Sequence, residues 1–236
     1  MKLFCLSFAG GTASFFDQVE KSLGSEIDVI KLEYAGHGER RKEGFYNSFR
    51  ELALDQIRAI KENITNNEEY ALFGYSMGCI SIMAILQEIN NCNDINAPKY
   101  IFIAAHEPNT IKGPAINQDE SLDEIIKRRT IQLGGVPQTL INNSSFWRMY
   151  LPVLRADYGL IIKYDFDALE YKSEIPVSIL YSEEDTPLKE MQKWQKYFLG
   201  NVDYYKFSGS HFFIKDNYQE FANIINEKLR RIDYDI

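Results

Sequence analysis

Short apolar runs alternate with segments of helical periodicity along most of this chain, and that alternation leaves few folds open. Runs typical of buried strands lie at residues 3–8, 27–32, 70–73, 100–105, 177–181 and 204–207. Between them, apolar residues recur every three or four positions in residues 15–23, 49–64, 77–89, 191–198 and 218–229. Strands that alternate with helices build a parallel sheet, because each helix carries the chain back to start the next strand. We therefore predict an α/β fold with a mostly parallel central sheet flanked by helices.

One long segment, at about residues 107–164, interrupts this alternation. It contains no convincing strand, and glycine and proline residues separate short amphipathic pieces within it. A loop of that length without secondary structure is uncommon, so we predict a helical insertion that acts as a lid over an active site. The alternative is a helical subdomain without a role in the site. Because no repeat, low-complexity tract or linker divides the chain, we expect residues 1–236 to form a single domain.

Composition argues against several classes of function. The three cysteines show no CxxC spacing, so we expect no disulfide framework, no zinc or other metal site and no cofactor. With 26 basic and 34 acidic residues, the formal net charge of -8 opposes binding to nucleic acid or to an anionic membrane. No apolar run approaches the roughly 18 residues of a membrane span, and the N-terminus does not read as a signal peptide. We therefore expect a cytoplasmic protein.

Residues 74–78, Gly-Tyr-Ser-Met-Gly, match the pattern G-x-S-x-G. A predicted strand leads into the motif and a predicted helix follows it, which is the setting of a nucleophile elbow. In such an elbow the glycines permit a sharp turn, and the serine hydroxyl is presented above the N-terminus of the helix. The sequence therefore indicates Ser76 as a nucleophile. The alternative is that Ser76 only caps the helix.

A serine needs a base to become a nucleophile, and the chain has three histidines. His211 follows the last predicted strand, at the edge of the sheet where sites of open α/β folds collect. In α/β-hydrolases the chain order is serine, acid, histidine, and only His211 has the required downstream place. His37 and His106 also follow predicted strands, and we interpret both as surface loop histidines.

The acid that orients the histidine is predicted to be Asp185, on the loop after the strand at residues 177–181. Other acids were weighed for this role: Glu183, Glu184, Asp157 and Asp165. The two glutamates share the loop and are interpreted as solvated turn charges, whereas the two aspartates lie in the predicted insertion.

Two backbone amides are expected to bind the oxyanion of a tetrahedral intermediate. One belongs to Met77, directly after the nucleophile, and the other to Ala9, on the glycine-containing loop after the first strand. A Gly-Gly turn there is also compatible with phosphate binding, but the patterns G-x-G-x-x-G and G-x-x-x-x-G-K-[ST] are both absent. Nucleotide binding is therefore not expected.

Taken together, these motifs resemble the type II (external) thioesterases associated with nonribosomal peptide and polyketide synthases. The likeness covers nearly the whole chain, and several of its pieces fall in the predicted lid. The matching segments are residues 3–5, 9–16, 35–40, 73–78, 133–137, 151–157, 176 and 209–213. Two positions depart from the family pattern: His37 stands where the family has arginine in Pro-Gly-Arg-Gly, and Tyr75 stands where it usually has histidine. Neither change removes a catalytic group, but both are expected to alter substrate contacts.

The resemblance implies hydrolysis of acyl or aminoacyl thioesters on the phosphopantetheine arm of a carrier protein, to clear stalled or mis-primed synthases. Ser76 would attack the thioester carbonyl with His211 as base and Asp185 as its orienting acid. The alternatives are a broad-specificity acyl-CoA thioesterase or carboxylesterase and, outside enzymes, a hydrolase-fold binding module.

The expected partners are acyl or peptidyl carrier protein domains, and we expect the chain to be a monomer. Carrier proteins are typically acidic, and a net charge of -8 cannot attract them at long range. Docking therefore requires a local basic patch. We assign this role to Arg128 and Arg129, in the densest basic run of the insertion. Arg155 is expected either to contribute or to pair with Asp157 or another acid of the insertion.

Overall fold

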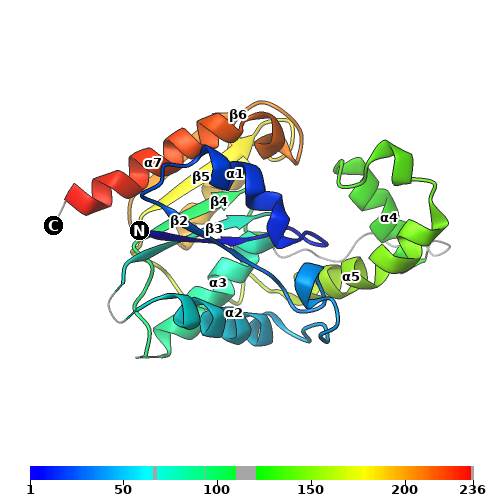
Figure 1. Ribbon diagram of the computed structural model, residues 1–236, viewed down its shortest axis with the longest axis horizontal. Helices are drawn as coiled ribbons and strands as arrows, with labels where there is room; N and C mark the ends of the chain where they lie inside the picture. Colours follow the sequence, from blue (N-terminus) through cyan, green and yellow to red (C-terminus); the bar gives the residue numbers. More distant parts are fainter. Residues whose placement is uncertain (66–67, 93, 110–120, 235–236) are drawn as a thin grey trace.

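A computed structural model describes residues 1–65, 68–92, 94–109 and 121–234 of the chain. Its centre is a six-stranded sheet in the order β2-β1-β3-β4-β5-β6, in which every neighbouring pair is parallel (Figure 1). The strands are β1 Lys2–Leu6, β2 Asp28–Leu32, β3 Tyr70–Tyr75, β4 Tyr100–Ala104, β5 Val177–Ser182 and β6 Val202–Phe207. The six predicted strands and the parallel α/β fold are confirmed, with strand ends shifted by one or two residues.

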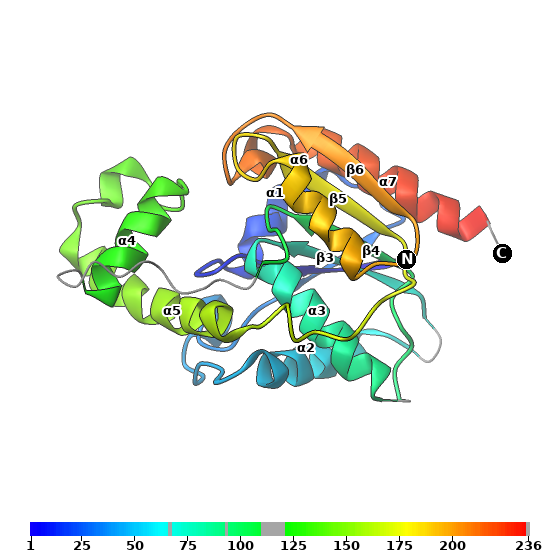
Figure 2. The ribbon, with the colours of Figure 1, turned by 180° about the vertical axis from the view of Figure 1, so that it is seen from behind.

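Helices cover both faces of the sheet. They are α1 Asp17–Ser22, α2 Phe49–Asn63, α3 Met77–Asn90, α6 Leu188–Met191 and α7 Tyr218–Tyr234. Short 3-10 helices occur at Ala13–Phe16, Gly38–Arg40, Gln192–Lys196 and Phe213–Asp216. α1 and α7 lie on one face, and α2 and α3 lie on the other (Figures 1 and 2). None of these helices, nor any other in the described ranges, is both long and apolar enough to span a membrane.

The burial of the strands explains why their sequences are continuously apolar. Every residue of β3, β4 and β5 is buried, because helices cover both faces of these central strands. Along β1, alternate residues enter opposite cores: Leu3 and Cys5 pack toward α1 and α7, whereas Phe4 and Leu6 pack toward α2 and α3. The sheet therefore lies between two apolar layers, one on each face, and this packing fixes the positions of the strand ends.

The segment between β4 and β5 is helical, as predicted. It comprises α4 Leu122–Gln132, a 3-10 turn at Gln138–Leu140 and α5 Ser144–Lys163; residues 110–120 of the expected insertion lie outside the described ranges. α4 stands away from the sheet, while α5 runs back toward it (Figures 1 and 2). A separate apolar cluster joins the two helices: Ile126, Val136, Trp147, Leu151 and Leu154. The insertion thus has a small core of its own.

Candidate active site

Ser76 lies at a strained turn between β3 and α3. Its φ is 54° and its ψ is -114°, a left-handed conformation that a non-glycine residue adopts only when the surroundings enforce it. A Cβ on Gly74 would come 2.5 Å from the carbonyl oxygen of Gly78, and one on Gly78 would overlap the carbonyl oxygen of Leu6. Both glycines of the motif are therefore required by close backbone packing, which is the geometry of a nucleophile elbow.

The structure brings the three predicted side chains of the triad together. His211 Nε2 lies 3.1 Å from Ser76 Oγ, and His211 Nδ1 lies 2.9 Å from Asp185 Oδ1. An ionised carboxylate only accepts hydrogen bonds, so Nδ1 carries the proton and Nε2 presents a lone pair to the serine hydroxyl. Ser76 therefore donates to His211, which donates to Asp185. The side chains of His211 and Asp185 are only 9% and 10% exposed, so water competes little for the bond between them.

Neighbouring groups hold the His211 loop in place. The buried Tyr75 hydroxyl donates to the carbonyl oxygen of His211 at 2.6 Å, and its ring stands edge-on to the imidazole. Ser182, at the end of β5, donates to the carbonyl oxygen of Gly209 on the same loop. Tyr75 does not line the cavity beside Ser76. Its contacts are with the loop of His211.

The rival acids have other partners. Glu183 and Glu184 are exposed, as expected of turn charges, and Glu184 accepts the amide hydrogen of Gly209 at 3.1 Å. Asp165 accepts the amide hydrogen of Asp167 at 2.9 Å and caps the turn after α5. Asp157 is buried in a different network, described below.

A small cavity of about 20 Å³ lies beside Ser76. Its lining comes both from loops of the sheet and from the insertion: Phe8, Ala9, Ser76, Thr130, Leu133, Gly135, Tyr158, His211 and Phe212. A space of that size holds about one water molecule. Ala9 is thus next to the nucleophile, and Met77, as the first residue of α3, has an amide without an acceptor inside its helix. Thr130, Leu133, Gly135 and Tyr158 of the insertion line the same cavity as Ala9.

His37 is buried, not exposed, so the interpretation of it as a surface histidine is wrong. Its ring Nδ1 lies 3.0 Å from the carbonyl oxygen of Ala35, and Nε2 lies 2.9 Å from Asp157 Oδ2. A carbonyl oxygen and an ionised carboxylate are both acceptors, so this geometry favours an imidazole that is protonated on both nitrogens and charged. Burial opposes that charge, but the hydrogen bond and the attraction of Asp157 outweigh it and raise the pKa of His37. The sequence feature that could have indicated this environment is the position of His37, which stands where the family has an arginine.

The interpretation of His106 as a surface histidine is also wrong. Its ring is partly buried near Phe166, and within the described residues Nε2 has no hydrogen-bond partner. Desolvation lowers the pKa of His106 to about 4, so this ring is neutral at pH 7. The ring next to His106 belongs to Phe166, sixty positions further along the chain, and local sequence patterns do not reveal contacts of that kind.

The arginines of the insertion divide into two groups. Arg155 pairs with Asp123, its Nη2 lying 2.8 Å and 2.9 Å from the two carboxylate oxygens, so it pairs with an acid of the insertion. Arg128 and Arg129 are exposed on α4. Among the described residues, no group of three or more His, Cys, Asp and Glu side chains could hold a metal ion.

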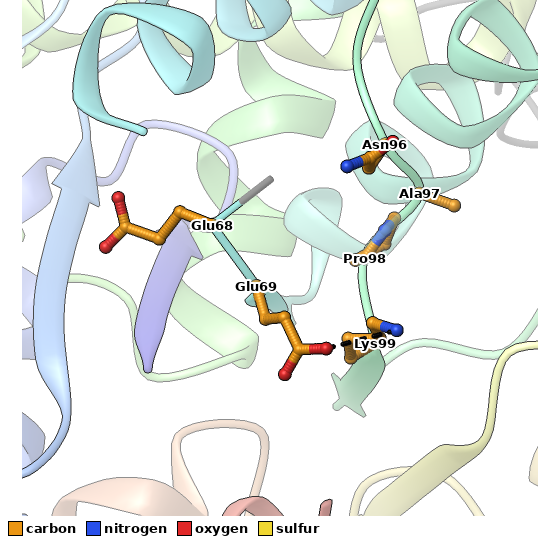
Figure 3. A pocket seen from close by; sticks show the side chains of 6 residues that line it. All are labelled: Glu68, Glu69, Asn96, Ala97, Pro98 and Lys99. Atoms are coloured by element: carbon orange, nitrogen blue, oxygen red, sulfur yellow. Dashed lines mark ion pairs between the residues drawn. The ribbon is translucent and has the colours of Figure 1, made fainter. Parts of the chain in front are cut away.

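A larger hollow, of about 520 Å³, lies at the opposite ends of β3 and β4 (Figure 3). Six residues line it: Glu68, Glu69, Asn96, Ala97, Pro98 and Lys99. Two of these residues form an ion pair, in which Lys99 Nζ lies 3.2 Å from Glu69 Oε1. None of the predicted site residues lines this hollow; Ser76, Asp185 and His211 lie at the opposite edge of the sheet.

Comparison with known proteins gives consistent matches. A family model for the thioesterase domain matches residues 1–229. The thioesterase PikA5 of Streptomyces venezuelae is 25% identical over 235 residues, covering 97% of this chain and 81% of that protein. The medium-chain S-acyl fatty acid synthase thioesterase of Rattus norvegicus is 27% identical over 217 residues, covering 90% and 81%. The crystal structure of ClbQ from the colibactin NRPS/PKS pathway has a TM-score of 0.87 at 21% identity, covering 99% and 98%. These matches confirm the resemblance and the α/β-hydrolase fold expected from the sequence.

The buried charge on His37 predicts distinct histidine titrations. Because the folded pKa is raised, the pair with Asp157 stabilises the fold fully below the unfolded value near 6.5 and loses that contribution as the pH rises through the folded pKa. NMR titration of the three imidazoles, assigned with His37→Gln, should place His37 above about 6.5 and His106 well below it. A His37 signal that titrates below 6 would contradict the charged pair.

Proposed function

Because the chain belongs to the thioesterase family, we propose that it hydrolyses acyl or aminoacyl thioesters on the phosphopantetheine arm of carrier proteins, and so clears nonribosomal peptide or polyketide synthases. The observation that carries the proposal is the hydrogen-bonded series of Ser76, His211 and Asp185 at a strained elbow. It provides a nucleophile, a base and an orienting acid. ClbQ, whose fold this chain shares, comes from an NRPS/PKS pathway, which supports a carrier-bound substrate.

The first half-reaction forms an acyl-enzyme. Ser76 Oγ attacks the thioester carbonyl carbon while its proton passes to His211 Nε2. The amides of Ala9 and Met77 donate to the oxyanion. Collapse of the tetrahedral intermediate expels the sulfur of the phosphopantetheine arm, which takes the proton from His211, so the imidazole is neutral again. A thiolate is a good leaving group, so protonation by His211 matters less here than it does for an amine.

The second half-reaction releases the acid. His211 takes a proton from water, the resulting hydroxide attacks the acyl carbonyl, and Ser76 leaves with that proton. Asp185 keeps the imidazole in the tautomer that presents Nε2 to the reacting groups, and it stabilises the imidazolium that forms in each half-reaction. All these groups belong to the chain, so the cycle needs no cofactor.

The insertion must move for a carrier arm to enter. The cavity beside Ser76 has room for about one water molecule, and Thr130, Leu133 and Tyr158 of the insertion contribute to its walls. A phosphopantetheine arm with its acyl group needs more space than that, so these side chains move apart when the substrate binds. We therefore assign the insertion the role of a lid, which excludes bulk water once the acyl group has entered.

A second candidate substrate is a medium-chain fatty acyl thioester, because the rat relative is named for a fatty acid synthase. A longer chain requires a larger displacement of the lid. The candidate substrates are distinguished by their kcat/KM values. The comparison includes short acyl groups and medium-chain acyl groups on a carrier protein, acyl-CoA and nitrophenyl esters. A preference for CoA or nitrophenyl esters over the carrier-bound group would favour the broad-specificity alternative.

Replacement of Ser76 by alanine is expected to abolish thioester hydrolysis without unfolding the protein, because the residue supplies the nucleophile rather than core volume. The loss in kcat should exceed about a thousandfold. Asp185→Asn should also be severe, through the wrong histidine tautomer, and Glu184→Gln is the matched control on the same loop. Residual activity of Ser76→Ala within tenfold of the parent would overturn the nucleophile, and a greater loss in Glu184→Gln than in Asp185→Asn would overturn the choice of acid.

Reversal of Arg128 and Arg129 to glutamate should raise KM for acyl carrier protein several-fold, more at low salt than at high salt. Both side chains are exposed on α4, and surface charges act over about 8 Å at physiological ionic strength. Hydrolysis of a small nitrophenyl ester should be nearly unchanged. The control is reversal of Arg50 and Arg58, which are exposed on α2. Equal losses on both substrates would indicate damage to the lid, and an unchanged KM would place the docking surface elsewhere.

A further inference from the structure

Helix α5 packs against Gly10, on the loop that carries Ala9. Gly10 has a φ of +77°, a conformation that favours glycine, and a Cβ there would come 2.6 Å from both Leu154 Cδ2 and Tyr150 Oη of α5. The backbone of the loop and the side of α5 are therefore in direct contact beside the nucleophile.

A single carboxylate oxygen joins three segments at this contact. Asp157 Oδ2, on α5, accepts the amide hydrogen of Gly10 at 2.6 Å and the Nε2 hydrogen of His37 at 2.9 Å. His37 follows β2, and its other nitrogen is fixed by the carbonyl oxygen of Ala35. The side chains of His37 and Asp157 are 1% and 4% exposed, so water cannot replace either partner without opening the packing.

The charged groups around His37 come from two elements. Asp157 faces it from α5, and Glu33, just after β2, adds a weaker attraction. Glu33 also accepts the amide hydrogen of Ala13 at 3.0 Å, at the far end of the same loop. Loss of either His37 or Asp157 would leave a buried charge without its partner, which is costly.

The constraint on Gly10 reaches the amide of Ala9 through the peptide geometry. The Gly10 N–H belongs to the peptide unit that follows Ala9, so its hydrogen bond to Asp157 orients that peptide plane. The Ala9 N–H shares a planar peptide unit with the carbonyl of Phe8, which accepts the amide hydrogen of Gly11 at 2.8 Å. The two hydrogen bonds thus restrain the peptide planes on both sides of Ala9 and, with them, the direction of its N–H.

We propose that Asp157 and His37 are positioning residues: through Gly10 they aim the Ala9 amide at the oxyanion, so that the oxyanion hole is complete only when α5 is seated. This inference rests on the proposed function of the site. It assigns the charged pair a role in the tetrahedral intermediate rather than in substrate binding. It also gives a structural role to His37, the departure from the family pattern, because His37 Nε2 lies 2.9 Å from Asp157 Oδ2.

The test compares Asp157→Asn with the parent on a short-chain acyl thioester and with a trifluoromethyl ketone, which forms a tetrahedral adduct on the serine. Removing one oxyanion donor lowers kcat by about a hundred- to a thousandfold. A misdirected donor should cost less, so we expect kcat to fall roughly ten- to a hundredfold while KM changes less than about twofold. The affinity for the ketone should fall by the same factor as kcat/KM. His37→Gln, whose amide can still donate to Asp157, should lose less.

The matched control is Asp123→Asn, which breaks the exposed ion pair with Arg155 within the lid but does not touch the loop. It should keep parental kcat and ketone affinity. The inference is overturned if Asp157→Asn and His37→Gln both keep kcat within twofold when assayed well below their melting temperatures, or if kcat falls while ketone affinity is unchanged. If Asp157→Asn does not fold, His37→Leu, which removes the donor to Asp157, decides by the same twofold criterion. A parent no more active than Ser76→Ala would instead refute the proposed function.

Discussion

The parallel direction of the strands is the constraint on which the rest of the structure depends. Ser76 follows β3, Asp185 follows β5 and His211 follows β6, and the ends of these strands meet at one edge of the sheet. Residues more than a hundred positions apart thereby come within hydrogen-bond distance. The apolar layers on both faces hold the strands in register, so the core fixes the geometry of the site.

Strain and charge are concentrated where that edge meets the insertion. The left-handed backbone at Ser76 is held by two glycines packed against other backbone segments. Beside it, the ion pair of His37 and Asp157 links the lid to the loop of Ala9. A buried pair of this kind contributes little net stability, because desolvation offsets the attraction between its charges. In the proposed mechanism its role is to define geometry, because a lid linked in this way couples closure to the arrangement of the proposed catalytic groups.

Sequence reasoning predicted the parts of the fold that depend on local patterns. Apolar runs marked all six strands, and the position of Ser76 between a strand and a helix predicted the elbow. The rule of chain order selected His211 and Asp185, which the structure places together. The environments of His37 and His106 were missed because the groups that bury them come from the insertion and from distant loops. For the same reason, the role of Tyr75 behind His211 was visible only in the structure.

The central claim is that Ser76 is the nucleophile that carries the acyl group, and stoichiometric labelling with a fluorophosphonate tests it most directly. Cys79, on the helix after the elbow, is fully buried, and burial raises the pKa of its thiol, so it is a poor competitor. Peptide mapping by mass spectrometry should find one label per chain, on Ser76. A label on Cys79 or Cys92, or no label in a protein that still hydrolyses thioesters, would contradict the serine mechanism.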